Sequence, residues 1–299
     1  MEFEAKMRVL VLGSTGMLGQ AVMSELKRRG LDPVGVSRTT SISFDAMSQT
    51  FESLMRRPFV GRVDAVVNCI GWIPQKASDD EALNTLIAHR LNVSLVEEIA
   101  SYTQVHDLNW IQIGTDCIYD GLVGNYHEDS VSTPTDLYSR TKYDGEEFTA
   151  SSIFIRCSIV GPDVGYKTGL YEWFKRMRVS GDEVQGYENH FWNGVTTNAF
   201  ARLAAGLIET NWTQAIKVHW IPRGTVTKAD LLRLFCKYLE GEVTGILPFE
   251  APREINRTLG SKQESLISRL WSIAGYETIP TIEELVSEMV EAEKRVGDG

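Results

Sequence analysis

The sequence is poor in the residues that build disulfide frameworks and metal sites. Its 299 residues include only four cysteines, and no two are close in the chain: Cys69, Cys117, Cys157 and Cys236. Each lies among apolar residues, which indicates reduced, mostly buried thiols of a cytoplasmic protein. There is no Cys-x-x-Cys or His-Glu-x-x-His segment, and the five histidines are scattered. A zinc site is therefore not expected, and no other metal is indicated.

Basic charge and long apolar runs are also scarce. The formal net charge is −10, whereas binding to nucleic acid or to an anionic membrane needs a basic surface. No apolar run approaches the ~18 residues of a membrane span. The first six residues contain no apolar segment of the kind that marks a signal peptide. We therefore expect neither nucleic acid nor a membrane as a partner, although a few local arginines can still hold an anionic small ligand.

A glycine-rich segment near the N-terminus carries the first positive signal. Residues 8–12 are almost wholly apolar, which predicts a strand buried on both faces of a parallel sheet. A Gly-x-x-Gly-x-x-Gly segment and then a helical pattern follow it directly. Such glycines let the backbone turn sharply and approach a pyrophosphate, which then lies at the helix N-terminus. We therefore predict dinucleotide binding by the whole segment: Gly13, Ser14, Thr15, Gly16, Met17, Leu18 and Gly19.

The end of the second predicted strand, residues 33–37, normally decides which dinucleotide is bound. An acidic residue there would bind the ribose 2′-hydroxyl, whereas an arginine accommodates a 2′-phosphate. This chain has Ser37 followed by Arg38, and no acid before Asp45. We therefore favour NADP(H), with NAD(H) as the alternative. Asp45 is a candidate contact near the adenine ring, or else the cap of a helix that begins at Ala46.

The next predicted strand, over residues 64–71, ends in a glycine that would let the backbone pass close to the cofactor. Its last residues are therefore expected at the cofactor site: Cys69, Ile70 and Gly71. The apolar spacing over residues 79–102 predicts one long helix, which contains Asn92. Since a buried asparagine needs hydrogen-bond partners, Asn92 either braces backbone beside the cofactor or lies on the helix surface.

The strand predicted over residues 110–114 delivers Thr115 and Asp116 to its carboxyl end, where ligands bind in such sheets. Further strands are expected at 153–157 and 216–221, with helical patterns between them. This alternation predicts an α/β fold. Its architecture is a Rossmann-type doubly wound parallel sheet with a smaller C-terminal substrate subdomain.

A helix beyond a polar loop places Tyr138 and Lys142 four residues apart, on one face. A phenol of pKa ~10 needs ~4 kcal/mol of preference for its phenolate to reach a pKa near ~7, at ~1.4 kcal/mol per unit. An ammonium at ~4 Å supplies on the order of 4 kcal/mol at an effective dielectric constant of ~20. We therefore expect Lys142 alone to be roughly sufficient, so that Tyr138 serves as a general acid.

The glycine segment is followed, in order, by four motifs: Asn-Cys-Ile-Gly at 68–71, Gly-Thr-Asp-Cys-Ile-Tyr-Asp-Gly at 114–121, Tyr-x-x-x-Lys at 138–142, and Ile-Arg-Cys-Ser at 155–158. Together they resemble the extended short-chain dehydrogenases/reductases, and most closely the dTDP-4-dehydrorhamnose reductase group. The resemblance implies a sugar-nucleotide reductase whose catalytic triad is Thr115, Tyr138 and Lys142. Thr115 would bond the ketone oxygen and Lys142 the nicotinamide ribose. Related dehydratases carry Asp-Glu after this threonine, so the pair Asp116-Cys117 argues against dehydration.

The second half of the chain is expected to bind a nucleoside-diphosphate sugar. The predicted NADP-binding domain spans residues 7–157 plus about 196–221, and the substrate-binding subdomain about 158–195 and 222–299. Asp116 and Cys117 are candidate substrate contacts, with Trp192 as an apolar wall and Arg257 as a phosphate contact. The weaker candidates are Lys175, Arg178, Arg223, Arg253 and Trp173.

Local patterns in this half predict further elements. Residues 189–197 are expected to form a turn that runs into a helix capped by Thr196 or Thr197. Helices are also predicted at 170–179 and from Thr227 through Tyr238. The last predicted helix spans residues 281–296 and begins with a capping box, Thr-x-x-Glu.

Two other functions stay open. The group that this sequence resembles includes a non-catalytic, NADP-binding regulatory subunit of a methionine adenosyltransferase, and a regulator can keep the set Thr115, Tyr138 and Lys142. An epimerase that retains NAD is the other alternative, and Arg38 speaks mildly against it. The oligomeric state is not predicted, and a homodimer is possible.

Overall fold

The computed structural model describes residues 6–297, apart from residues 164, 166, 168 and 240–244. The extreme N-terminus and part of the loop expected at 161–167 therefore lie outside the described residues. Within the described chain, no helix combines the length and the apolar character needed to cross a membrane.

Six parallel strands form the central sheet, in the order β10-β5-β4-β3-β1-β2. Their bounds are β1 (Arg8–Leu12), β2 (Asp32–Val36), β3 (Ala65–Asn68), β4 (Asn109–Gly114), β5 (Ile153–Arg156) and β10 (Ile216–His219). The chain leaves β1 towards β2 and then returns to build β3 on the other side. The carboxyl ends of β1 and β3 therefore flank the point where strand order reverses, which is where such sheets bind ligands.

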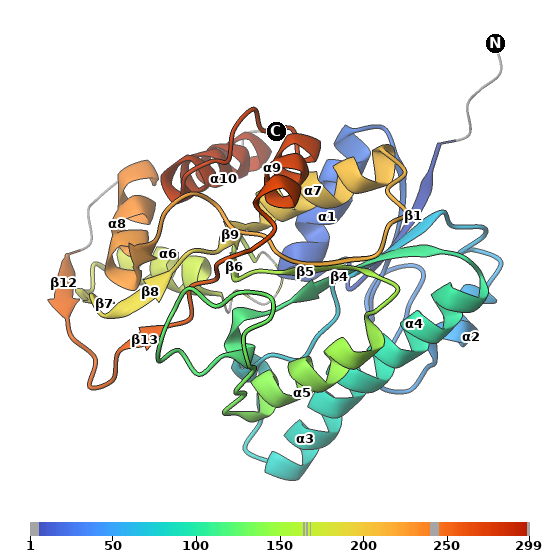
Figure 1. Cartoon of the computed structure of the whole chain (residues 1–299), viewed down its shortest axis with the longest axis horizontal. Helices are drawn as coiled ribbons and strands as arrows, with labels where there is room; N and C mark the ends of the chain where they lie inside the picture. Colours follow the sequence, from blue (N-terminus) through green and yellow to red (C-terminus); the bar gives the residue numbers. More distant parts are fainter. Residues whose placement is uncertain (1–5, 164, 166, 168, 240–244, 298–299) are drawn as a thin grey trace.

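Helices cover both faces of the sheet (Figure 1). One layer comprises α1 (Met17–Arg28), α7 (Thr197–Glu209) and α9 (Glu264–Ile273), and the other comprises α2 (Phe51–Met55), α3 (Glu81–His89), α4 (Leu95–Val105) and α5 (Leu137–Gly145). The apolar core is correspondingly split by the sheet. Val22 and Leu203 pack in one half and Leu54 and Ile99 in the other. This three-layer arrangement confirms the predicted fold class.

The helix predicted over residues 79–102 is not regular throughout. Between α3 and α4 the chain forms a π-helical segment, η2 (Arg90–Ser94), with Asn92 buried inside it. Such π turns occur as single turns inside α-helices and are frequent at functional sites. The prediction of one long helix is therefore confirmed in outline, with a π turn at the position of a candidate site residue.

A smaller lobe lies beside the sheet (Figure 1). Its helices are α6 (Leu170–Ser180), α8 (Lys228–Tyr238) and α10 (Ile282–Gly297). Its strands are β6 (Ile159–Val160), β7 (Val184–Tyr187), β8 (His190–Trp192), β9 (Val195–Thr196), β11 (Val226–Thr227), β12 (Ile246–Phe249) and β13 (Ile255–Asn256). The pairs are β7 with β12 and β6 with β9, while β8 joins β11 and β13.

This lobe corrects one prediction and extends another. Residues 189–197 form β8 and β9 instead of a turn, because their hydrogen-bond partners come from distant segments such as β13. Thr196 does cap α7, accepting a hydrogen bond from the Ala199 backbone. The division into a cofactor domain and a substrate subdomain stays a proposal, and α9 within the proposed subdomain packs into the core beside α7.

Candidate active site

The turn between β1 and α1 is shaped for close approach. Gly13 has a φ of 74°, a left-handed conformation that favours glycine. A Cβ on Gly19 would stand 2.2 Å from the Gly13 carbonyl oxygen, so only glycine lets the first turn of α1 lie against this loop. Gly16 is the N-cap of α1, with no side-chain cap and no acidic residue in the first turn. The helix N-terminus is therefore suited to an anionic group.

The other residues of the segment have distinct positions. Ser14 is buried, and its hydroxyl has no hydrogen-bond partner within the described part of the chain. A buried donor without a partner is costly, which fits a ligand oxygen at this place. The Thr15 carbonyl accepts a hydrogen bond from Gln20, while Leu18 packs in the core and Met17 is half-buried. These features together fit the pyrophosphate of a dinucleotide.

The segment after β2 places Arg38 on the surface and Ser37 in a turn. The Ser37 backbone donates to Thr40 Oγ1 at 2.8 Å, and the Ser37 hydroxyl accepts from the Thr39 backbone at 3.2 Å. The Ser37 side chain thus orders the turn from which the exposed Arg38 projects. Asp45 caps a turn by accepting from the Met47 backbone at 3.1 Å. The helix itself starts only at α2, six residues beyond Asp45.

After β3, the backbone is braced by Asn92. Its side-chain oxygen accepts from the Trp72 backbone at 2.9 Å, and its amide nitrogen donates to the Trp72 carbonyl at 3.2 Å and to Thr141 Oγ1 at 3.0 Å. A Cβ on Gly71 would lie 3.2 Å from the Asn92 oxygen. Asn92 therefore ties the segment containing Cys69, Ile70 and Gly71 to α5. This matches the bracing alternative and gives Asn92 a positioning role.

Thr115, Tyr138 and Lys142 converge at the carboxyl end of β4. Thr115 caps the short helix η3 (Asp116–Ile118), where its hydroxyl accepts from the Cys117 backbone at 3.2 Å. The Tyr138 hydroxyl also contacts the Thr115 side chain. Lys142 Nζ donates to the Ile113 carbonyl at 3.0 Å. The capping box of Asp136 and Ser139 fixes the start of α5 and with it the direction of Tyr138.

The electrostatic prediction for this pair does not hold in the protein alone. Burial raises the pKa of Tyr138 above its ordinary value, although the Thr115 contact opposes the rise. Burial also lowers the pKa of Lys142 to about 8, while the Glu146 charge raises it. Desolvation disfavours phenolate and ammonium alike, and it is the largest influence on the pKa of each group. The charge of Lys142 alone therefore does not bring the pKa of Tyr138 close to neutral pH.

The predicted substrate residues surround Asp116. Burial raises the pKa of Asp116, and the charges of Lys228 and Arg257 lower it. Burial likewise raises the pKa of Cys117 to about 12. Arg257 is half-buried and its Nε donates to the Tyr119 carbonyl at 2.9 Å. The buried Trp192 indole donates to Ser158 Oγ at 2.8 Å.

Several weaker candidates are placed elsewhere. Lys175 is held by Glu172 at 2.8 Å and Glu293 at 2.5 Å, so it serves the contact between α6 and α10. Trp173 packs at the edge of the small lobe's apolar core. Arg253 Nη2 donates to the Asp120 carbonyl at 3.4 Å, on the rim of the loop that follows Thr115.

Two functional features escaped the sequence interpretation. The sequence placed Lys228 only at the start of the helix that begins at Thr227. In the structure, burial lowers the pKa of Lys228, and the charges of Asp116 and Cys117 act on it in the opposite direction. Behind the site, the buried Arg156 pairs with Glu146 and donates to His219 Nε2 at 2.7 Å. His219 Nδ1 faces the carbonyls of Tyr126 and Gly260 at 2.9 and 2.8 Å and therefore carries the ring proton. An arginine inside an apolar strand was the available signal for this network.

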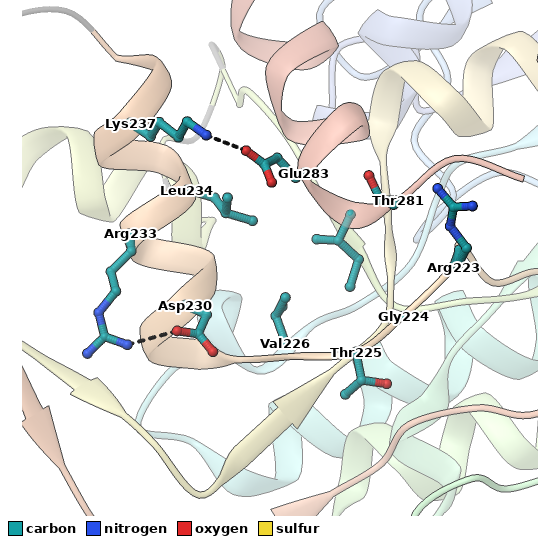
Figure 2. A pocket seen from close by; sticks show the side chains of 11 residues that line it. Arg223, Gly224, Thr225, Val226, Asp230, Arg233, Leu234, Lys237, Thr281 and Glu283 are labelled. Carbon is teal, nitrogen blue, oxygen red and sulfur yellow. Dashed lines mark hydrogen bonds and ion pairs between the residues drawn. The ribbon is translucent and has the colours of Figure 1, made fainter.

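A groove of about 380 Å³ lies away from the predicted catalytic residues, between α8, residues 223–226 and the start of α10. Figure 2 shows two ion pairs along it, Arg233 with Asp230 and Lys237 with Glu283. None of the predicted catalytic residues lines it. In the described part of the chain, no three His, Cys, Asp or Glu side chains cluster as a metal site would require.

Two known proteins resemble this chain over about half of its length. Methionine adenosyltransferase 2 subunit beta of Xenopus laevis is 27% identical over 141 residues, 46% of this chain and 41% of the relative. dTDP-4-dehydrorhamnose reductase of Mycolicibacterium smegmatis is 28% identical over 142 residues, 47% of this chain and 40% of the relative. The chain thus aligns with less than half the length of either relative.

A solved structure extends the likeness in fold. dTDP-4-dehydrorhamnose reductase of Bacillus anthracis, in complex with NADP, superimposes with a TM-score of 0.77 at 17% identity, over 96% of this chain and 99% of that one. The family model described as "RmlD substrate binding domain" matches residues 7–294. The resemblance found in the sequence is confirmed: the chain belongs to the RmlD substrate binding domain family.

Proposed function

We propose that this protein is an NADPH-dependent reductase of the 4-keto group of a nucleoside-diphosphate-linked deoxysugar. The observation that carries the proposal is the convergence of Thr115, Tyr138 and Lys142 beside a turn fitted for a dinucleotide pyrophosphate. Reduction of a ketone requires a hydride on carbon and a proton on oxygen. NADPH would supply the hydride when bound. The remaining tasks fall to side chains of this chain.

Tyr138 donates the proton to the ketone oxygen. Its raised pKa keeps the phenol protonated at neutral pH, which is the state a proton donor needs before reaction. Thr115 orients the ketone oxygen by a hydrogen bond from its hydroxyl. The Lys142 ammonium stabilises the phenolate that remains after transfer, and a site closed by substrate strengthens that attraction. A protonated Tyr138 is the starting state for ketone reduction, whereas oxidation of the alcohol would need the phenolate as a base.

NADP(H) is the favoured cofactor and NAD(H) the alternative. The exposed Arg38 at the end of β2 is suited to a 2′-phosphate, and the B. anthracis relative was solved with NADP. For the sugar nucleotide, the proposed contacts are Asp116 and Cys117 near the reacting carbon, Trp192 as an apolar wall and Arg257 for the diphosphate. All four lie around the carboxyl end of β4 or the facing lobe.

The test is to offer dTDP-, GDP-, UDP- and CDP-linked 4-keto-6-deoxyhexoses with NADPH and to follow NADPH absorbance. Stoichiometric oxidation with at least one of them supports the proposal. Thr115→Val is the matched variant, because it keeps the side-chain shape and removes the hydroxyl. We expect it to slow turnover by roughly a hundredfold. No oxidation with any of the four nucleotides would overturn the proposal.

A second candidate is a regulatory subunit that binds NADP without turnover. The observation that favours it is the alignment with methionine adenosyltransferase 2 subunit beta. This candidate predicts NADP binding, no oxidation with any sugar nucleotide, and a change in the activity of an added methionine adenosyltransferase catalytic subunit. The keto-sugar panel therefore separates the two functions.

A further inference from the structure

Lys228 lies where the helix it begins does not favour a cation. It is the first residue of α8, directly after the N-cap Thr227. The N-terminus of a helix carries partial positive charge, so a lysine in this first turn is unfavourable. The side chain is also half-buried, and desolvation lowers the pKa of Lys228 below its ordinary value. Neither helix stability nor burial explains a lysine at this position.

The groups around Lys228 belong to the candidate active site. Its Nζ lies 5.3 Å from the centroid of the Trp192 ring, and Trp192 is fixed by its hydrogen bond to Ser158. The negative charge of Asp116 acts on Lys228, and the charge of Lys228 acts on Asp116 in return. Among the described residues, however, no carboxylate forms an ion pair with Lys228. The ammonium and the Asp116 carboxylate therefore influence each other electrostatically without forming an ion pair.

An ammonium held over an aromatic ring, within the field of a carboxylate, fits one kind of ligand. A sugar ring presents hydroxyl groups that both donate and accept. An ammonium can donate to one hydroxyl oxygen while a carboxylate accepts from a hydroxyl proton. Charged partners also make these hydrogen bonds stronger than neutral ones.

We propose that Lys228, placed over the Trp192 ring and within the field of Asp116, is a specificity-determining residue that binds a hydroxyl group of the sugar in the sugar-nucleotide substrate. The inference rests on the proposed function and deepens it. It assigns the sugar, and not the diphosphate, to this part of the small lobe. It also explains why a helix begins with a lysine: the residue serves the ligand at the expense of helix stability.

Lys228→Met tests the contribution of the Lys228 charge separately from that of its side-chain length. Methionine keeps an unbranched side chain of similar length over Trp192 and removes the ammonium. Lys237→Met is the control, because it removes a lysine from the same helix at an exposed ion pair with Glu283. Binding is measured by calorimetry with NADP⁺ present, using dTDP-glucose and dTDP, or UDP-glucose and UDP if wild type prefers uridine. These probes contain no ketone, so the readout does not depend on turnover.

We expect Lys228→Met to lower the affinity for the nucleotide-linked glucose by about tenfold or more. Its affinity for the nucleoside diphosphate without sugar should stay within about twofold of wild type. The melting temperature of the variant should stay level or rise, since an unfavourable charge is removed from the helix N-terminus. A merely structural lysine would give the reverse, a lower melting temperature with unchanged affinity. The Lys237→Met control should leave both affinities unchanged.

The failures are distinguishable. If the variant loses affinity equally for the nucleotide-linked glucose and for the nucleoside diphosphate, Lys228 contacts the diphosphate. That result would overturn the assignment of Lys228 to the sugar. Unchanged binding of both by Lys228→Met would overturn the inference while leaving the reductase proposal intact. If wild type binds no nucleotide sugar, both the reductase proposal and this inference fall together.

Discussion

The backbone carbonyl oxygen of Asn92 lies where Gly145 would have to place a side chain. A Cβ added to Gly145 would stand 2.0 Å from that oxygen. The contact joins the π-helical segment η2 to the last residue of α5, the helix that carries Tyr138 and Lys142. The Asn92 side chain meanwhile holds the Trp72 backbone. One asparagine thus sets the position of both the catalytic helix and the loop after β3.

Gly145→Ala is therefore expected to destabilise the fold and to slow turnover together. Backbone must move to admit the methyl group, at a cost of roughly 2 kcal/mol or more. Since the movement displaces α5, Tyr138 shifts relative to Thr115. Urea unfolding and steady-state kinetics measure the two effects. Asp144→Ala, an exposed neighbour on the same helix, is the control, and equal stability of the two variants would contradict this account.

Arg38→Ala should reduce the affinity for NADPH by about tenfold or more and leave that for NADH nearly unchanged. The guanidinium can hold a 2′-phosphate, which NADH lacks, through charge-assisted hydrogen bonds. Fluorescence titration of the two reduced cofactors measures both affinities. Arg56→Ala removes a comparable surface arginine, paired with Glu52, and serves as the control. Equal weakening of NADPH and NADH would remove the argument for NADP(H).

The rate of reduction should fall as pH rises through about 8. Burial lowers the pKa of Lys142 to about 8, so its charge is present below that pH and is lost above it. The raised pKa of Tyr138 keeps the proton donor intact over the same range. Turnover measured at saturating substrate from about pH 6 to 9 tests this. A rate that rises through pH 8 would indicate that Tyr138 reacts from its phenolate form.

His219 should make the fold acid-sensitive. Burial lowers the pKa of His219 from 6.5 to about 4, and the charge of Arg156 acts in the same direction. Between these values the unfolded chain binds a proton that the folded chain does not, so stability is lost as pH falls from 6.5 towards 4. The contribution of this residue is about 3 kcal/mol. Denaturant unfolding across this range measures the loss, and NMR should show His219 neutral at pH 5; a titration near pH 6.5 would disprove the assignment.

Local patterns predicted the cofactor half of the chain well. The apolar runs of β1, β3 and β4 and the glycine turn before α1 are contiguous signals, and strand order then brings their ends together. Tyr138 and Lys142 could be paired because helical spacing alone places them on one face. The capping box at Thr281 and Glu284 was likewise predicted, because its two members are three residues apart, and the structure contains it.

Features that depend on distant partners could not be predicted in this way. The strands β7 and β12 have four residues each, and they pair although some sixty residues separate them in the sequence. Neither segment alone is long enough to predict a strand. The Asn92 side chain at the π turn is held by Trp72 and Thr141, which are distant in the sequence. The pKa shifts of Tyr138 and Lys142 are set mainly by burial under surrounding elements, which helical spacing does not reveal. The role proposed for Lys228 depends on its interactions with Asp116 and Trp192, which lie on other elements of the structure.

The most direct test of the central claim is a single-turnover comparison of wild type and Tyr138→Phe with NADPH and a nucleotide-linked 4-keto-6-deoxyhexose. We predict that wild type oxidises one NADPH per ketone reduced. Tyr138→Phe should bind NADPH with unchanged affinity and react at least about a hundredfold more slowly, because only the phenol hydroxyl is removed. Equal rates in the two proteins would contradict the assignment of Tyr138 as the proton donor. Absence of NADPH oxidation by wild type with every nucleotide would contradict the reductase itself.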